Sequence, residues 1–262
     1  MGEIERLERT FSLYRSDSEI LLLNREGRLD APSHDLRLLL GEAQRYGNLS
    51  GGAFDVTVQP LWRLYSGHFA ARPETSEGPD PKEIERARTL VDYHGIDLDN
   101  GRAILARSGM EITLNGMAQG YITDRIADML RDAGMTNVLV DMGEIRALDG
   151  GTWKVGVEDP RQPGQIMRDL SVTSGAVATS AGMGSKFDRA GRFHHLFDPA
   201  TGHSADRCLS ATAVAPTAME ADALATALAV SPSWQANNLV QAFGGRRAIL
   251  VMADGNIREA GA

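Results

Sequence analysis

This sequence of 262 residues contains a single cysteine, Cys208, which excludes an internal disulfide and any site built from several thiolates. It has no apolar run near the ~20 residues of a membrane-spanning helix. Residues 1–6 lack the apolar core of a signal peptide, so we expect none in them. The motifs G-x-x-x-x-G-K-[ST], H-E-x-x-H, G-x-S-x-G and G-x-G-x-x-G are missing too. The usual nucleotide-binding loops, zinc peptidases and serine hydrolases are therefore excluded.

What is present is typical of a globular protein, with 42% hydrophobic and 24% charged residues. The 35 acidic residues outnumber the 27 basic ones, giving a net charge of −8 that would repel a phosphate backbone. We therefore expect no nucleic-acid partner. The 28 glycines allow many positions where the backbone turns sharply or approaches a ligand closely.

Helical and extended patterns alternate irregularly along the chain, which predicts an α+β fold with mixed or antiparallel sheets and packed helices. We expect one domain over residues 1–262, and a mobile loop at 71–81, where three prolines occur. The predicted helices are 4–13, 35–46, 82–93, 119–133, 218–230 and 234–243. The predicted strands are 103–105, 110–114, 138–142, 153–158, 170–173, 193–197 and 209–215, followed by a hairpin from 247 through 254–255.

Two glycine-containing segments are candidates for ligand binding. In Ser50–Asp55, two glycines precede Phe54 and a carboxylate, so backbone N–H groups could face a ligand with the ring as a wall. The alternative is an ordinary loop. Thr113–Tyr121 leads into a helix, where free N–H groups could bind an anion and carbonyls a cation. The alternative here is a tight connection between two elements.

Two further segments carry candidate catalytic or metal-binding residues. His194 and His195 are adjacent on a predicted strand and so face opposite sides, which excludes a shared zinc site but leaves a general base. The alternative is a structural histidine. Asp222 and Thr226 are four residues apart on an alanine-rich helix, where a buried carboxylate needs a partner such as Mg²⁺. Alternatively, Asp222 interacts only with the helix dipole.

Taken in order, these segments resemble the ApbE family of FAD:protein FMN transferases, and the resemblance covers nearly the whole chain. The family's S-G-G-x-F-D motif corresponds to Ser50–Asp55, and its D-L-G-[GA]-I-A-K-G-Y motif to Thr113–Tyr121. Its H-[IV]-[IL]-D-P-x-T-G motif corresponds to His195–Gly202. Ala215–Thr226 matches A-P-T-A-x-x-A-D-A-x-x-T at every fixed position. The last two motifs are long and specific.

The resemblance implies a T-fold-like α+β enzyme that cleaves FAD with Mg²⁺ and transfers FMN to a Thr or Ser of a target flavoprotein, releasing AMP. It implies a metal site at Asp222, Thr226 and the Gly116 carbonyl, with Ala225 adjacent. His195 would accept the proton of the attacking hydroxyl. The FAD site would be lined by Ala53, Phe54, Asp55, Thr113, Gln119 and Leu196. The alternatives are an FAD pyrophosphatase and a flavin-binding protein with weakened catalysis.

The two charged positions of the family motif are replaced in this chain: Thr113 replaces an aspartate and Gln119 replaces a lysine. Because one negative and one positive group are absent, we expect weaker FAD binding than in members that have both. The resemblance also implies a periplasmic protein or a membrane-anchored lipoprotein, with any membrane contact made only through an N-terminal anchor. We expect that the chain lacks the family's first strand, which precedes the first helix.

Overall fold

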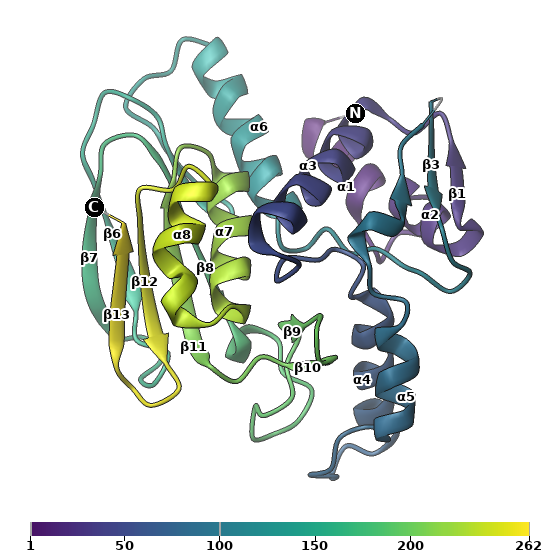
Figure 1. The fold of residues 1–262 in the computed structure, drawn as a ribbon. Coiled ribbons are helices and arrows are strands. Elements are labelled where there is room, and N and C mark those ends of the chain that lie inside the picture. The colour runs from purple at the N-terminus through teal and green to yellow at the C-terminus, as the bar shows by residue number, and fades with distance from the viewer. Residues whose placement is uncertain (1, 100, 262) are drawn as a thin grey trace. The chain divides into compact units, whose positions relative to one another are not determined.

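The computed structural model describes residues 2–99 and 101–261, which form two compact units (Figure 1). Unit 1 comprises the described residues up to Asn115 together with Ser185–Ala205. Unit 2 comprises Gly116–Gly184 and the described residues from Asp206 onward. Both units combine helices with antiparallel strands, so the α+β prediction is confirmed. Within the described ranges, no helix has both the length and the apolar character to cross a membrane.

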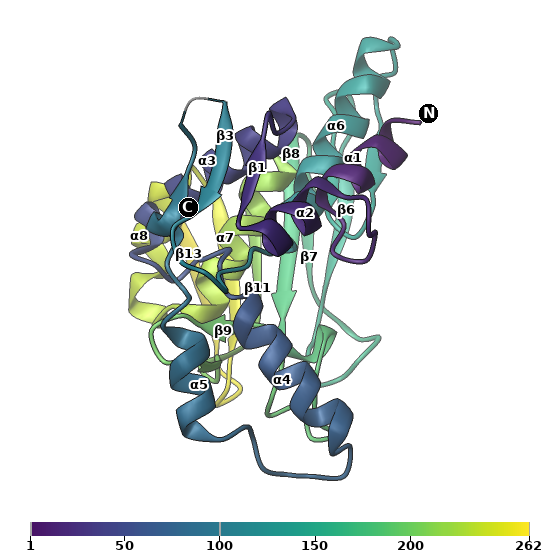
Figure 2. The ribbon, with the colours of Figure 1, turned by 90° about the vertical axis from the view of Figure 1, so that its right-hand side faces the viewer.

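Unit 1 is mainly helical and contains one small sheet of three antiparallel strands, in the order β1-β3-β2. Helices α4 and α5 lie side by side (Figures 1 and 2). The helices are α1 (Glu3–Phe11), α2 (Glu19–Glu26), α3 (His34–Ser50), α4 (Gln59–Ala71) and α5 (Pro81–Arg88), followed by the 3-10 turn η1 (Tyr93–Gly95). The strands are β1 (Arg28–Asp30), β2 (Ile96–Asp97) and β3 (Arg102–Leu105), with a separate pair β9 (Phe197–Asp198) and β10 (His203–Ser204).

An aromatic cluster connects helices α4 and α5 to the segment Ser185–Ala205. Tyr65 and Phe69 of α4 are buried and contact Phe193, and the Tyr65 ring lies 5.0 Å from that of Phe197. Each such ring buries a large apolar area. The cluster therefore holds this late segment of the sequence within unit 1.

Unit 2 contains a six-stranded antiparallel sheet in the order β13-β12-β11-β8-β5-β4. Helix α7 packs on β8 and β11. The opposite face is covered by a hairpin, β6–β7, through a core that includes Val157, Val172, Val177 and Ile249. The strands are β4 (Leu139–Asp141), β5 (Ile145–Ala147), β6 (Trp153–Glu158), β7 (Ile166–Val172), β8 (Gly175–Ala181), β11 (Cys208–Ala215), β12 (Arg247–Met252) and β13 (Ile257–Gly261). The helices are α6 (Ala118–Asp132), α7 (Ala218–Val230) and α8 (Ala236–Ala242), with short 3-10 turns η2 (Gly182–Gly184) and η3 (Ser233–Gln235).

One predicted strand is wrong and another is shorter than expected. Residues 110–114 form no strand, because the Asn24 amide donates to the Ile112 carbonyl at 2.8 Å and accepts from its N–H at 2.6 Å. Within 193–197 only Phe197 belongs to a strand, β9; His194 forms an isolated antiparallel bridge with Lys186, and its N–H donates to the Ser204 hydroxyl. The predicted alternation nevertheless holds, as His194 is buried and His195 is partly exposed.

The helix expected at 82–93 ends already at Arg88, and Tyr93 begins the 3-10 turn η1. The other predicted elements lie close to their expected positions, including the helices at 119–133 and 218–230. Residues 72–80 contain no helix or strand. Glu74 forms a 2.7 Å ion pair with Arg189, and the Glu77 carbonyl lies 2.9 Å from the His68 ring. The mobility of the loop at 71–81 and the single domain over 1–262 stay predictions.

Small residues bring α7 close to its neighbours in unit 2. The sheet face that it covers presents alternate alanines, including Ala176 and Ala178 of β8. On its other side α6 approaches at Gly120, where an added Cβ would lie 2.3 Å from the Ala218 carbonyl oxygen. Only glycine fits at position 120 without moving one of the helices.

We therefore expect Gly120→Ala to destabilise the protein by about 1–3 kcal/mol, the usual range for overpacking a rigid core. Gly67→Ala is the matched control, because Gly67 is an exposed helical glycine with no atom near its added Cβ. The control is expected to gain about 0.5–1 kcal/mol. Urea unfolding of both variants measures the difference. Equal stability of the two variants would contradict the close approach.

Candidate active site

The start of α7 is fixed by two independent sets of hydrogen bonds. Thr217 and Glu220 form a capping box, in which each side chain accepts the other residue's backbone N–H. From α6, the Asp124 carboxylate accepts the N–H groups of Ala218 at 2.8 Å and Met219 at 2.9 Å. A carboxylate at this end of a helix also interacts favourably with its dipole. The position of α7 along α6 is thereby defined.

Asp222 lies one turn into α7 and is 5% exposed. Its Oδ2 accepts a 3.3 Å hydrogen bond from the Gly120 N–H in the first turn of α6. Burial raises the pKa of Asp222 well above its usual value, and the nearby Glu144 carboxylate raises it further. A single long hydrogen bond does not offset the cost of burying this charge.

The other predicted metal-binding residues also lie in unit 2. Thr226 follows Asp222 by one helical turn, and its hydroxyl shares a 3.1 Å hydrogen bond with the Ser180 hydroxyl of β8. Ala225 is fully buried. Gly116 is half-buried in the turn that precedes α6. Unit 2 thus contains all four predicted metal-site residues, while their metal-binding roles stay predictions.

Two carboxylates of this region were missed by the sequence analysis. Glu144 lies in the turn between β4 and β5 and is 8% exposed, with Oε2 buried and unpartnered. Burial, together with the nearby Asp141 carboxylate, raises the pKa of Glu144 to about 7. The second missed residue is Asp124. The signal for Glu144 was a polar residue directly after a predicted strand, which is too common to single out.

The donor set fits a hard divalent cation. Asp222 and Glu144 provide carboxylates and Thr226 a hydroxyl, which are the oxygen ligands that Mg²⁺ prefers. Arg146, the nearest cation in sequence to Glu144, is already paired with Asp124 at 3.3 Å and with the Pro216 carbonyl. Among the described residues, no group of three or more His, Cys, Asp or Glu side chains forms a metal-binding cluster. The remaining ligands of an ion here would be water or a bound anion.

The residues at the two replaced charged positions each have a local partner. Gln119 lies in the first turn of α6, and its Nε2 donates to the Met142 carbonyl at 2.7 Å. Thr113 belongs to unit 1, where its N–H donates to Val56 and its hydroxyl accepts the N–H of Asn115. Gln119 thus binds the same turn that carries Glu144. The expected weakening of FAD binding stays a prediction.

The segment Ala53–Asp55 follows α3 in unit 1, after two glycines with positive φ. Phe54 is 2% exposed and meets Tyr46 edge-on at 5.7 Å, so its ring belongs to the core. Asp55 accepts three hydrogen bonds, from the N–H and hydroxyl of Thr57 and from the N–H of Tyr93. Burial still raises the pKa of Asp55. The segment therefore offers a ligand mainly its backbone and Ala53, which is partly exposed.

His195 has the hydrogen bonding of a neutral general base. Its Nδ1 lies 3.0 Å from the Ser185 carbonyl oxygen, and since a carbonyl only accepts, Nδ1 carries the proton. Nε2 is then the free acceptor. Burial lowers the pKa of His195 below its usual 6.5. The next residue, Leu196, is buried, and its N–H donates to the His194 ring.

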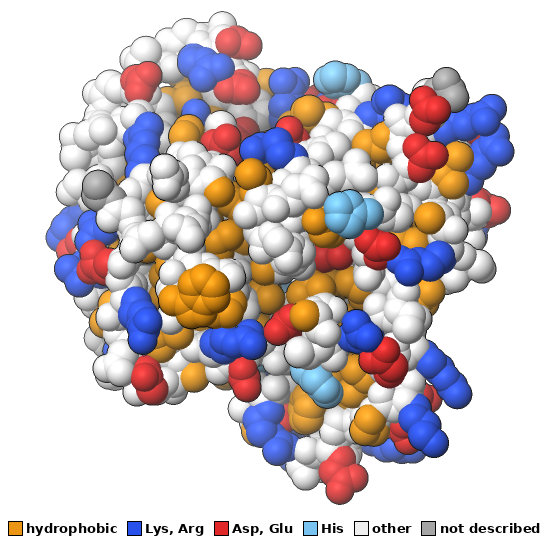
Figure 3. Space-filling view, viewed as in Figure 1, with side chains coloured by type: hydrophobic (Ala, Val, Ile, Leu, Met, Phe, Trp, Pro, Cys, Tyr) orange, Lys and Arg blue, Asp and Glu red, His pale blue; other side chains and the backbone are white. Residues whose placement is uncertain are grey.

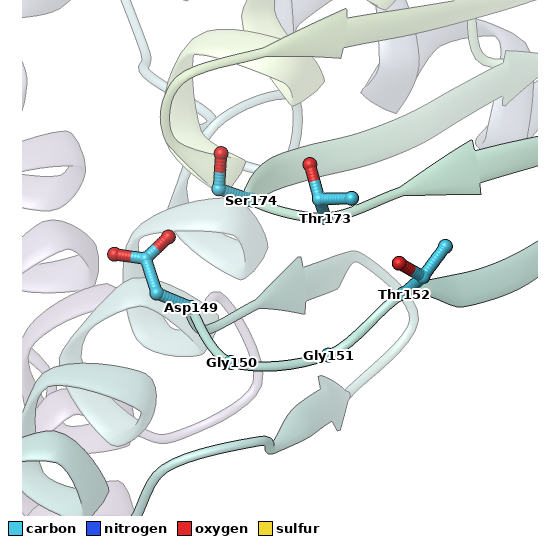
Figure 4. Close-up of a pocket in the computed structure, with 6 residues that line it drawn as sticks. All are labelled: Asp149, Gly150, Gly151, Thr152, Thr173 and Ser174. Carbon is cyan, nitrogen blue, oxygen red and sulfur yellow. The ribbon is translucent and has the colours of Figure 1, made fainter.

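Other surface features lie away from these residues. A polar hollow of about 470 Å³ in unit 2 is lined by Asp149, Thr152, Thr173, Ser174 and two glycines (Figure 4). It contains none of the predicted site residues. On the face drawn in Figure 3, basic and acidic side chains are interspersed.

These observations define an α+β protein with buried carboxylates suited to a divalent cation and a histidine held as a neutral base. The chain belongs to the ApbE family, whose sequence model matches residues 1–250. Among curated proteins it is similar to the FAD:protein FMN transferase of Treponema pallidum, with 30% identity over 97% of this chain and 76% of the relative. It is also similar to the FAD:protein FMN transferase of Haemophilus influenzae, with 31% identity over 84% of this chain and 67% of the relative.

Solved structures agree with this assignment. The fold is similar to the ApbE protein of Thermotoga maritima, with a TM-score of 0.86, 29% identity, and coverage of 97% of this chain and 85% of that chain. It is also similar to the flavin transferase ApbE of Vibrio cholerae, with a TM-score of 0.79, 26% identity and coverage of 97% and 84%. The ApbE-like fold inferred from the sequence is therefore confirmed.

The cap that Asp124 provides leads to a stability prediction. Asp124→Ala is expected to cost about 2–4 kcal/mol, because it removes a helix cap and leaves two amide donors and Arg146 without their partner. Asp128→Ala, on the same helix, removes only an exposed pair with Arg131 and is expected to cost at most about 0.5 kcal/mol. Thermal or urea unfolding measures both. A small loss in Asp124→Ala would show that the capping box alone positions α7.

Proposed function

We propose that this chain is a Mg²⁺-dependent FAD:protein FMN transferase. A Thr or Ser hydroxyl of a target flavoprotein attacks the phosphorus that carries the riboflavin part of FAD. The P–O–P bond breaks, FMN becomes linked to the hydroxyl oxygen, and AMP leaves. The observation that carries the proposal is the buried, uncompensated carboxylate of Asp222 in a chain of the ApbE family.

His195 is suited to take the proton of the attacking hydroxyl. Its Nδ1–H bond to Ser185 fixes the ring and leaves Nε2 as the acceptor. The lowered pKa keeps the imidazole neutral at neutral pH, so it does not have to lose a proton first. A general base of this kind is typically worth ~10²–10⁴-fold in rate.

Asp222, Thr226 and the Gly116 carbonyl are the proposed metal ligands, with Ala225 beside them. When bound, Mg²⁺ would neutralise charge on the diphosphate as its bond breaks. Hydrogen bonds within the protein orient these oxygens. The Ser180 hydroxyl orients the Thr226 hydroxyl, and the Gly120 N–H orients the Asp222 carboxylate. The proposed FAD contacts are Ala53, Phe54, Asp55, Thr113, Gln119 and Leu196.

The second candidate is an FAD pyrophosphatase, in which water takes the place of the acceptor hydroxyl and the products are FMN and AMP. It would use the same site residues. The third candidate is a flavin-binding protein with weakened catalysis, which the replacement of the family's lysine by Gln119 favours. Incubation with FAD, Mg²⁺ and an acceptor protein separates the three. Covalent flavin on the acceptor indicates transfer, free FMN indicates hydrolysis, and unchanged bound FAD indicates the third.

We also propose a periplasmic location, or attachment to a membrane as a lipoprotein. The proposal is supported by the family resemblance alone. Fractionation of the source cells with an antibody against this chain tests it. Recovery in the cytoplasmic fraction would contradict it.

For the base, His195→Ala is expected to slow transfer by ~10²–10⁴-fold with FAD affinity almost unchanged. His34→Ala, at an exposed histidine of unit 1, is the control and should retain full activity. The wild-type rate should rise with pH with a midpoint below pH 6.5, because the base must be neutral and its pKa is lowered. A loss confined to FAD affinity, or a midpoint above 6.5, would contradict the assignment.

For the metal, Asp222→Asn is expected to abolish FAD cleavage while the protein stays folded, because the variant keeps the size of the side chain but loses its charge. Chelation of Mg²⁺ from the wild-type protein should have the same effect, reversed by adding the ion back. Release of AMP measures both. Turnover in Asp222→Asn with unchanged Mg²⁺ dependence would rule out this site.

A further inference from the structure

The turn between β4 and β5 is held firmly against α6. The two strands pair with Asp141 opposite Ile145, so Met142, Gly143 and Glu144 form the turn. Gly143 has a φ of +98°, and a Cβ there would collide with the Gln119 amide. That amide donates to the Met142 carbonyl, and the Gly143 N–H donates to the Asp141 carboxylate. These contacts therefore fix the position of the backbone at Glu144.

The Glu144 side chain is buried from this turn without a partner for Oε2, and it is 8% exposed. The first turn of α6 contacts both this turn and Asp222: Gln119 donates to the Met142 carbonyl, and the next residue, Gly120, donates to the Asp222 carboxylate. In agreement with this placement, the Glu144 carboxylate raises the pKa of Asp222 by repulsion. Two negative groups thus lie close together in a region with few donors. One of them receives only the Gly120 N–H.

Removal of a buried carboxylate from water is costly unless a cation or several donors compensate it. The cation nearest in sequence, Arg146, is bound to Asp124 and to the Pro216 carbonyl. The Oε2 atom of Glu144 is buried and receives no hydrogen bond. A shared divalent cation with oxygen ligands would compensate both carboxylates.

We propose that Glu144 is a further carboxylate of the Mg²⁺ site, supplying an oxygen to the coordination shell of the ion opposite Asp222. This inference rests on the proposed function, in which Asp222 holds the metal. The turn then couples α6 to the site, since Gln119 positions the backbone from which Glu144 extends. Glu144 would then tighten metal binding.

The test is metal binding measured without turnover. Mn²⁺ is titrated into wild type, Glu144→Gln, Asp222→Asn and Asp141→Asn, and free Mn²⁺ is followed by electron paramagnetic resonance. One series uses Mn²⁺ alone, and a second adds ADP as a diphosphate. Asp141→Asn is the matched control, because it removes one negative charge from the same hairpin at an exposed side chain.

We expect Glu144→Gln to weaken Mn²⁺ binding at least tenfold, Asp222→Asn to weaken it more, and Asp141→Asn to change it less than threefold. Without metal, Glu144→Gln should melt at a higher temperature than wild type, because the repulsion with Asp222 is relieved. Added Mg²⁺ should then stabilise the variant less. The melting curves also show that the variant is folded.

Three other results are possible, and each one contradicts either the role of Glu144 or the proposed metal site. If Asp222→Asn loses binding and Glu144→Gln does not, the proposed site stands and Glu144 has no part in it. If Glu144→Gln and Asp141→Asn lose affinity equally, Glu144 acts only through net charge, which also overturns the inference. If wild type binds Mn²⁺ in neither series, or Asp222→Asn binds normally, the proposed metal site itself fails.

Discussion

The close approach of α6 and α7 is the constraint on which the chemistry of unit 2 depends. It requires a glycine at position 120, whose missing side chain lets the helix reach the backbone of Ala218. The same contact directs the Gly120 N–H to Asp222 and the Asp124 carboxylate to the start of α7. One interhelical contact therefore sets both the burial of the Asp222 carboxylate and the position of α7, the helix that carries it.

The alanine-rich surroundings of α7 have a related effect. Since short side chains bring the helix close to the sheet, Thr226 comes within hydrogen-bonding distance of Ser180 on β8. The packing is dense and apolar, so the carboxylates of Asp222 and Glu144 are poorly solvated. Two poorly solvated carboxylates lower the stability of the protein when no cation is bound, and they favour the binding of a cation. Sites of this kind commonly reduce stability in favour of function.

Much of this could be predicted from the sequence, because the signals were local. The alanine run predicted α7, and the spacing of Asp222 and Thr226 placed both on one helix. Family motifs supplied the fold and the remaining candidates. The strand expected at 110–114 failed because Asn24, 88 residues away in sequence, satisfies the backbone of Ile112. Glu144 was missed for the same reason: its importance comes from proximity to Asp222, which no local pattern encodes.

The path of the chain between the two units has a consequence for folding. The chain leaves unit 1 after Asn115, returns to it at Ser185 and leaves again after Ala205. The aromatic rings of 187–197, which complete the core around Tyr65, are therefore synthesised after the first part of unit 2. Contacts of such sequence separation form slowly. During synthesis, helices α4 and α5 lack the apolar side chains of this segment until residues 187–197 have emerged, so His195 reaches its place together with the segment that completes the core of unit 1.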